Sequence, residues 1–348
     1  MGLLTVAAIL QAIVLCAGIG LNLLLLYVII RFTKANVGFY KWLMASFCFY
    51  EFTYGLAALL VMPIHFVGYR SWFAFSYHGP LSSTPLATGF TSFYCALYGS
   101  WLGFVFSNYV YRYLSLCKQS WLIYVDHICW LKITLYVMFA FFLSLTTFCA
   151  FYSCRVHEPT KESMTFIKEN FGNEFENLSY IMVRIQDPVT GEVSPYGILS
   201  IIIHSTFLLA WLSIIGFCCA QIYLKIAFLH SIKNNNNVNI AVEKQLFSVL
   251  ILQTVIPLIF CDIPSIIHFT FPLYEKAAFF SQLSPLFTLS SSLPKLLDPL
   301  VSLMFIKAYR NAVKKMLGIE NSVNVSHEAR YLSSEVRPDI TQAKPDTY

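Results

Sequence analysis

The chain has 348 residues, of which 57% are hydrophobic and only 12% are charged. Soluble globular domains average about 45–50% apolar and about 25% charged residues, so this sequence holds too few charges to cover a water-facing surface. The net charge of +5 comes from lysines and arginines that are dispersed or that flank apolar segments. That distribution excludes a nucleic-acid-binding patch and indicates a membrane protein.

Seven segments are long and apolar enough to cross a bilayer, which takes about 20 residues in a helix. The first segment is longer than the apolar core of a signal peptide, so we expect it to be a retained span. The sequence therefore predicts an all-α membrane protein with a seven-transmembrane helix bundle in residues 1–318. Its spans lie at about 5–30, 41–64, 86–111, 130–152, 197–229, 245–271 and 280–306.

Basic residues indicate how the bundle is oriented. With the amino terminus outside, sixteen lysines and arginines lie on the inner side and six on the outer side. Because basic loops stay in the cytoplasm, we expect an outside amino terminus. Asn177 opens an Asn-Leu-Ser triplet in the long outer segment 153–196 and is a candidate for glycosylation. A similar triplet at Asn324 falls in the predicted cytoplasmic tail and should stay unmodified.

The segment after the last span has a helical pattern of its own. Phe305, Tyr309, Val313 and Met316 share one face, and basic residues lie away from it. This pattern predicts a basic amphipathic helix at about 306–317 along the inner headgroups. Residues 319–348 are polar and rich in Ser and Thr, so we expect a disordered cytoplasmic tail.

The third predicted span carries a continuous polar and aromatic face. Its members recur at steps of three and four, which places them on one side of a helix. One interpretation is bundle packing that ends in a snorkelling arginine. The other is a ligand-contacting outer half joined to a switch at the inner end. The face consists of Thr91, Tyr94, Tyr98, Trp101, Val105, Asn108 and Arg112.

Ionisable residues inside spans are costly and usually face the interior of the bundle. Glu51, Asp262, Lys295 and Asp298 are such residues here. Lys295 and Asp298 are three residues apart and can pair, and Glu51 lies at a similar depth and can join them. With Asn22 these three form a predicted intramembrane polar network. Its role stays open between a structural ion network, a conformational switch and an ion path.

The sixth predicted span contains Pro257 and Pro264, each of which removes a backbone hydrogen bond and favours a kink. This span is therefore a candidate moving element. Polar residues of spans three, five, six and seven complete a candidate lining for an outer cavity, although each of them also fits a simple packing role. The candidate ligand-binding residues are Thr91, Tyr94, Tyr98, Trp101, His204, Cys261, Ser265, His268, Thr288 and Ser291.

Sequence signatures of common enzymes are missing from the chain. It has no G-x-S-x-G, H-E-x-x-H, P-loop or G-x-G-x-x-G segment, and no C-x-x-C spacing typical of zinc sites. We therefore expect neither an enzyme nor a bound cofactor or metal.

Several short motifs occur in a characteristic order. Asn22 follows Gly20-Leu21 in span one, Tyr111-Arg112-Tyr113 closes span three, Pro257 interrupts span six, and Asp298-Pro299 lies near the end of span seven. In this order, from about residue 15 to 317, the chain resembles the nematode seven-transmembrane chemoreceptors of the Str superfamily. It looks most like serpentine receptor class r, with class j as the close alternative.

This resemblance implies a chemosensory G-protein-coupled receptor of the plasma membrane, in the cilia of sensory neurons. Such a receptor binds a small, often volatile molecule between spans 3, 5, 6 and 7 and activates a heterotrimeric G protein through the inner ends of spans 3 and 6. The implied switch residues are Tyr111, Arg112, Tyr113, Pro257, Asp298 and Pro299.

Two positions depart from the wider receptor pattern. Tyr111 replaces the acid that usually precedes the arginine, and Ser302 stands where a tyrosine is usual. An alternative function is a transporter or channel that uses Glu51, Lys295 and Asp298 as an ion path.

Overall fold

The structure is a computed structural model that describes residues 3–32, 39–68, 71–118, 120–121, 161, 165, 168–169, 175, 178–186, 190–232, 238–270 and 277–319. The predicted fourth span, Asn177, Asn324 and almost all of the predicted tail lie outside these residues. The described part is mostly helical, as the sequence predicts. Its long helices are α1 (Leu3–Phe32), α2 (Phe39–Val61), α3 (Ala87–Cys117), α7 (Pro195–Ile232), α8 (Val238–Pro257) and α10 (Ala277–Phe305).

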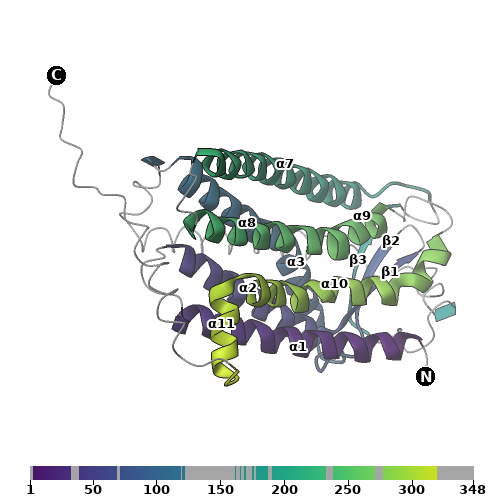
Figure 1. Ribbon diagram of the computed structural model, residues 1–348. Helices are drawn as coiled ribbons and strands as arrows, with labels where there is room; N and C mark the ends of the chain where they lie inside the picture. The colour runs from purple at the N-terminus through teal and green to yellow at the C-terminus, as the bar shows by residue number, and fades with distance from the viewer. Residues whose placement is uncertain are drawn as a thin grey trace.

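The long helices run side by side as a bundle (Figure 1). Helix α1 packs against α2 and α10, α3 packs against α2 and α7, and α8 packs against α10. A short helix, α11 (Lys307–Met316), follows α10 at a bend of 94°. It lies at the end of the bundle opposite to the point where α1 begins (Figure 1).

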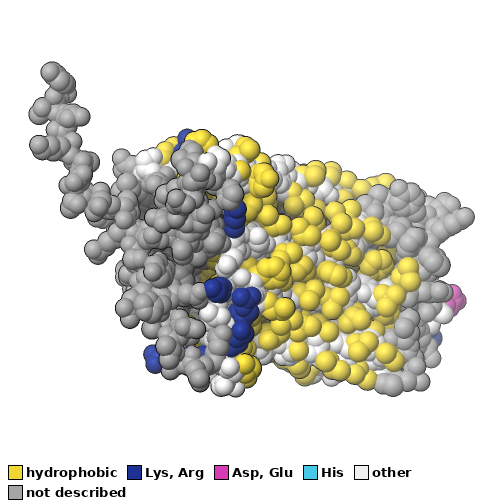
Figure 2. Space-filling model, in the orientation of Figure 1, with side chains coloured by type: hydrophobic (Ala, Val, Ile, Leu, Met, Phe, Trp, Pro, Cys, Tyr) yellow, Lys and Arg dark blue, Asp and Glu magenta, His cyan; other side chains and the backbone are white. Residues whose placement is uncertain are grey.

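The surface of the bundle is suited to lipid. Hydrophobic side chains form a broad belt, and lysines and arginines gather at the edge of the belt beside α11 (Figure 2). Within the described residues, four helical segments are long and apolar enough to cross a membrane by length and composition alone: Leu4–Phe32, Lys41–Val61, Leu208–Leu229 and Glu243–Ile267. The bent pair of α10 and α11 passes the same test jointly.

A three-stranded antiparallel sheet caps the other end of the bundle, which a purely helical prediction did not include. Strand β2 (Ser71–Ser76) lies between β1 (Pro63–Gly68) and β3 (Tyr180–Arg184). The register pairs Phe66 with Phe73 and Val67 with Trp72. Since neighbouring residues of a strand point to opposite faces, one face joins the core of the helices and the other packs its phenylalanines on Phe175.

The sequence between α2 and β1 explains why the chain leaves the helix there. Met62 takes a left-handed backbone conformation, with φ of 41°, and its N–H donates to the carbonyl of Ala58 at 2.7 Å. Such a residue commonly ends a helix, and Pro63 then prevents the helix from continuing. The predicted span at 41–64 therefore ends as a helix at Val61, and the chain turns back as a strand.

Where the sequence predicts a kink in span six, the structure has a local π-helix. Helix α8 ends at Pro257, the π-helix η3 (Leu258–Asp262) follows, and α9 (Ile263–Thr270) continues in the same direction. Proline lacks an N–H and its ring crowds the carbonyl four residues earlier. For Pro264 that carbonyl belongs to Phe260 in η3, so the widened turn relieves this crowding, and such turns are frequent at functional sites.

Helices α1 and α10 approach each other closely at Lys295. A Cβ atom added to Gly18 would lie 2.6 Å from the backbone oxygen of Lys295, which is closer than real Cβ contacts occur. Asn22, one turn further on, donates from Nδ2 to the same oxygen at 3.3 Å and to the carbonyl of Gly18 at 3.0 Å. A small residue and a buried amide therefore fix the seam between the two helices.

This seam can be tested with two glycines of the same helix. Gly18→Ala should lower the stability of the purified protein, because overpacking costs about 1–3 kcal/mol. Gly20→Ala is the matched control, since nothing lies within 4 Å of its added Cβ, and alanine is the better helix former by about 1 kcal/mol. Thermal unfolding in detergent measures both. Equal melting temperatures for the two variants would contradict the close approach.

Candidate functional site

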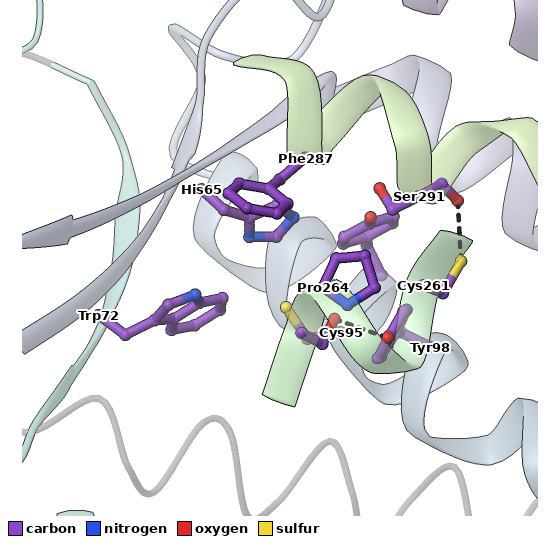
Figure 3. Close-up of a pocket in the computed structure, with 10 residues that line it drawn as sticks. His65, Trp72, Cys95, Tyr98, Cys261, Pro264, Phe287 and Ser291 are labelled. Atoms are coloured by element: carbon purple, nitrogen blue, oxygen red, sulfur yellow. Dashed lines mark hydrogen bonds between the residues drawn. The ribbon is translucent and has the colours of Figure 1, made fainter. Parts of the chain in front are cut away.

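A cavity lies between the sheet and the helices at the end of the bundle that the sheet caps (Figure 3). Its volume is about 50 Å³, which is more than a single water molecule requires. Aromatic rings, two thiols and two serine hydroxyls form most of its wall. The lining residues are His65 and Trp72 from the sheet, Tyr94, Cys95 and Tyr98 from α3, Cys261 from η3, Pro264 and Ser265 from α9, and Phe287 and Ser291 from α10.

Two hydrogen bonds join polar groups of the wall across helices. The hydroxyls of Tyr98 and Ser265 lie 2.7 Å apart and join α3 to α9 (Figure 3). The Cys261 thiol donates to the carbonyl of Ser291 at 3.3 Å and joins η3 to α10 (Figure 3). Ser291 in turn donates from Oγ to the carbonyl of Thr288 at 2.8 Å. The wall is therefore held by its own hydrogen bonds before any ligand arrives.

His65 enters the cavity from strand β1. Its ring stacks between Trp72, at 5.4 Å between centroids, and Tyr94, at 6.1 Å. Its backbone N–H donates to Thr288 Oγ1 at 3.4 Å, which ties β1 to α10. Burial lowers the pKa of the imidazole to about 4, so the ring is neutral at physiological pH. Its Nδ1 is buried and has no hydrogen-bond partner in the described part of the chain.

The structure brings together half of the residues that the sequence suggested for ligand binding, namely Tyr94, Tyr98, Cys261, Ser265 and Ser291. Thr288 supports the wall from behind by accepting the N–H of His65. Thr91 and Trp101 are buried in α3 and are not among the lining residues. The side chains of His204, in α7, and His268, in α9, fall outside the described residues.

Sequence reasoning missed His65, Trp72, Cys95 and Phe287, and it treated Pro264 only as a kink. The helical periodicity that singled out the face of α3 carries no information about a strand between two spans. The signal for the strands was present in the apolar runs from Pro63 to Gly68 and from Ser71 to Ser76. These short runs have the length and composition of strands that are buried on both faces.

A buried ion pair joins two helices between the cavity and the α11 end of the bundle. The Lys295 ammonium of α10 lies 3.0 Å from the Glu51 carboxylate of α2. It also lies 3.9 Å from the ring centre of Tyr54, a cation–π distance. In the described part of the chain Lys295 pairs with Glu51 and not with Asp298, which corrects the pairing expected from the spacing along one helix. Both carboxylate oxygens of Asp298 are buried there without a hydrogen-bond partner.

Polar contacts continue from this pair toward the α11 end of the bundle. Ser302 donates to the carbonyl of Asp298 at 3.2 Å and accepts from Gln253 Nε2 of α8 at 3.0 Å. Thr254, also on α8, lies 3.2 Å from the hydroxyl of Tyr109 on α3. Helices α3, α8 and α10 are therefore linked below Pro257 by side-chain hydrogen bonds.

At the end of α3, Arg112 forms an ion pair with α8. Its Nη1 lies 2.7 Å from Oε2 of Glu243, whose side chain is 33% exposed. Tyr111 packs at the edge of the apolar cluster formed by α1, α2, α10 and α11. The Tyr113 ring lies 5.9 Å from Phe217 of α7. In the described part of the chain the carboxylate partner of Arg112 therefore comes from another helix, and the residue before Arg112 is a tyrosine.

These features define the class of the protein. The fold matches the crystal structure of squid rhodopsin with a TM-score of 0.59, covering 96% of this chain and 91% of that chain at 11% sequence identity. The predicted helical bundle is therefore confirmed, and its fold is rhodopsin-like. The model of the serpentine-type seven-transmembrane G-protein-coupled chemoreceptors called Str matches residues 7–314. The chain belongs to this family, and the predicted resemblance is confirmed.

Named relatives agree with this assignment. The chain is 28% identical over 307 residues to serpentine receptor class r-10 of Caenorhabditis elegans, covering 84% of this chain and 85% of the relative. It is 27% identical to the class r-10 receptor of Caenorhabditis briggsae, covering 88% and 89%. It is 25% identical to the G-protein coupled receptor str-33 of C. elegans, covering 87% and 89%. The family is one of receptors and not a class of enzymes.

The ion pair of Glu51 and Lys295 can be tested with substitutions that change the number of buried charges. Lys295→Met leaves two buried carboxylates without a cation and should cost about 3–5 kcal/mol. Glu51→Gln leaves one buried carboxylate, that of Asp298, and one buried ammonium, that of Lys295. The charges still balance, so this substitution should cost less. Replacing both residues with Leu and Met removes the pair as a unit and should restore part of the loss. Melting temperatures of the purified variants give the ranking. A Lys295→Met variant as stable as the natural protein would refute the pairing.

Proposed function

We propose that this receptor binds a small, mostly apolar molecule in the cavity under the sheet and then activates a heterotrimeric G protein. The cavity supports this proposal because it is concave, aromatic and already shaped, as small-molecule sites usually are. Its wall joins α3, η3, α9 and α10, so a bound molecule contacts several helices at once. Helix α7 supplies none of the described lining residues, although the sequence suggested a contribution from its His204.

The proposed response is a shift between two populated conformations. A molecule in the cavity contacts η3 and α9. The π-helix η3, which follows Pro257, lacks the regular hydrogen-bond pattern of an α-helix. We infer that α8 pivots at this point and that its far end moves away from α3. The ion pair of Arg112 and Glu243 opposes that movement. Once it opens, Arg112 and the neighbouring Tyr111 and Tyr113 become available to a G-protein helix.

Substitutions at this ion pair test the switch. Arg112→Ala should abolish ligand-evoked signalling and leave surface expression unchanged. Glu243→Gln should raise signalling without ligand about fivefold, because a partly exposed pair contributes about 1 kcal/mol to the inactive form. Lys244→Gln is the matched control, since Lys244 is exposed and adjacent.

The readout is calcium in heterologous cells that express each variant, screened against volatile and water-soluble compounds. Intact ligand-evoked signalling in Arg112→Ala would count against the model. So would equal basal activity in Glu243→Gln and Lys244→Gln.

We further propose that the sheet faces the outside and α11 the cytoplasm, at the plasma membrane of sensory cilia. The basic residues at the α11 edge of the apolar belt support this orientation (Figure 2). The exposed lysines and arginines of α11 fit the headgroups of an inner leaflet. They are Lys307, Arg310 and Lys315.

Glycosylation gives an independent test of the orientation. Asn177 should carry sugar and Asn324 should not, because only the outer side meets the glycosylation machinery. A mobility shift on glycosidase treatment should disappear in Asn177→Gln and persist in Asn324→Gln. The opposite pattern would show that the bundle has the reverse orientation in the membrane.

The alternative ion-path function has less support. Glu51 and Lys295 neutralise each other in a direct contact, and family membership assigns the chain to receptors. Ion flux that persists without any G protein would favour the alternative.

A further inference from the structure

We propose that His65 is the polar anchor of the cavity and that the receptor selects small uncharged molecules carrying one hydrogen-bonding group. This inference rests on the proposed function, since it names the ligand class of the same cavity. It concerns a strand residue that helical patterns do not reveal.

The sheet register presents His65 to the cavity. His65 pairs with Ala74 across β1 and β2, and Val67 pairs with Trp72, so all four lie on the face toward the helices. Side chains on one face of neighbouring strands lie within reach along the diagonal, which gives the stacking of His65 on Trp72. A one-residue slip would exchange this face with the phenylalanine face. The position of the imidazole is therefore set by the packing of both faces.

The imidazole is held before binding. The backbone bond to Thr288 ties the strand at His65 itself to α10, and Trp72 and Tyr94 stack on the ring. A group whose rotamer is fixed in advance loses little entropy when it binds. His65 is thus positioned to recognise one polar atom of a ligand in a defined place.

His65 also has unused hydrogen-bonding capacity in the described part of the chain. The hydroxyls of Tyr98 and Ser265 bond to each other, and the Cys261 thiol bonds to a backbone carbonyl. Nδ1 of His65 has no partner in the described part of the chain, and the residue is only half-buried. A buried polar atom without a partner costs free energy that a ligand can recover. A neutral imidazole can donate from one nitrogen and accept at the other.

The charges near the cavity argue for an uncharged ligand. Burial holds the pKa of His65 near 4, so the ring offers no positive charge to an anion. The Lys295 ammonium is engaged by Glu51. Asp262 follows Cys261 in η3, and its Oδ2 lacks a partner among the described residues, but it is not a lining residue. A charged ligand would lose its hydration without gaining a facing counter-ion.

A series of five-membered rings tests the class, because its members share one compact carbon frame and differ in a single group. Cyclopentanol, cyclopentanone, methylcyclopentane and cyclopentylamine have nearly the same size. The first two carry one neutral hydrogen-bonding group, the third has none and the fourth is a cation. Binding to the purified full-length receptor in nanodiscs is followed by the concentration dependence of its thermal stability.

The natural receptor should bind cyclopentanol or cyclopentanone about tenfold more tightly than methylcyclopentane, the value of one buried hydrogen bond. His65→Phe keeps an aromatic ring for stacking, and it should reduce this preference to about twofold or less. His65→Gln retains a donor and an acceptor and should keep part of the preference. It also serves where the phenylalanine variant does not fold.

Several results would overturn the proposal. These are equal affinity of the natural receptor for cyclopentanol, cyclopentanone and methylcyclopentane, tighter binding of cyclopentylamine, no binding of any member, or an undiminished preference in His65→Phe. The measurement requires no G protein. A receptor that binds as expected but never signals would therefore refute the proposed function and leave this inference standing. A receptor that signals to cyclopentanol equally well with His65 or Phe at this position would refute the inference alone.

Discussion

The contact on which the rest of the bundle depends is the one that Lys295 makes in its middle. Its ammonium neutralises Glu51 of α2, and its backbone oxygen accepts from Asn22 of α1. Two charges removed from water are stable only when each faces the other, so this pair fixes the relative depth of α2 and α10. Lys295 thereby holds α1, α2 and α10 in one register, and the position of the cavity wall depends on that arrangement.

The same residue connects the cavity to the far end of the bundle. The Lys295 ammonium lies over the ring of Tyr54, and Tyr54 packs on Tyr94, which lines the cavity, at 5.2 Å between ring centres. In the other direction, α10 bonds to α8 through Ser302 and Gln253. Packed interiors respond to small shifts by moving between discrete arrangements. This continuous path gives the proposed population shift a physical route between ligand and G protein.

The helical part of the fold was predictable because lipid imposes a simple rule. Backbone polar groups must be satisfied within each segment, so long apolar runs become helices. The partner of Lys295 was only partly predictable. Sequence spacing places Asp298 beside it on one helix, whereas Glu51 comes from another helix, and its proximity depends on packing that no local pattern encodes. The partner of Arg112 was missed for the same reason, since Glu243 lies on a different helix.

The sheet marks where sequence reasoning failed, and its physics explains why. An exposed antiparallel sheet shows alternating apolar and polar residues, but here both faces are covered: Val67 and Trp72 contact the helical core, and Phe66 and Phe73 pack around Phe175. The sequences of such strands are continuous apolar runs, so they are easily taken for the end of a membrane span. Five of the eight lining residues on helices could therefore be anticipated from the sequence. The part built by His65 and Trp72 depends on a strand pairing that only the folded chain displays.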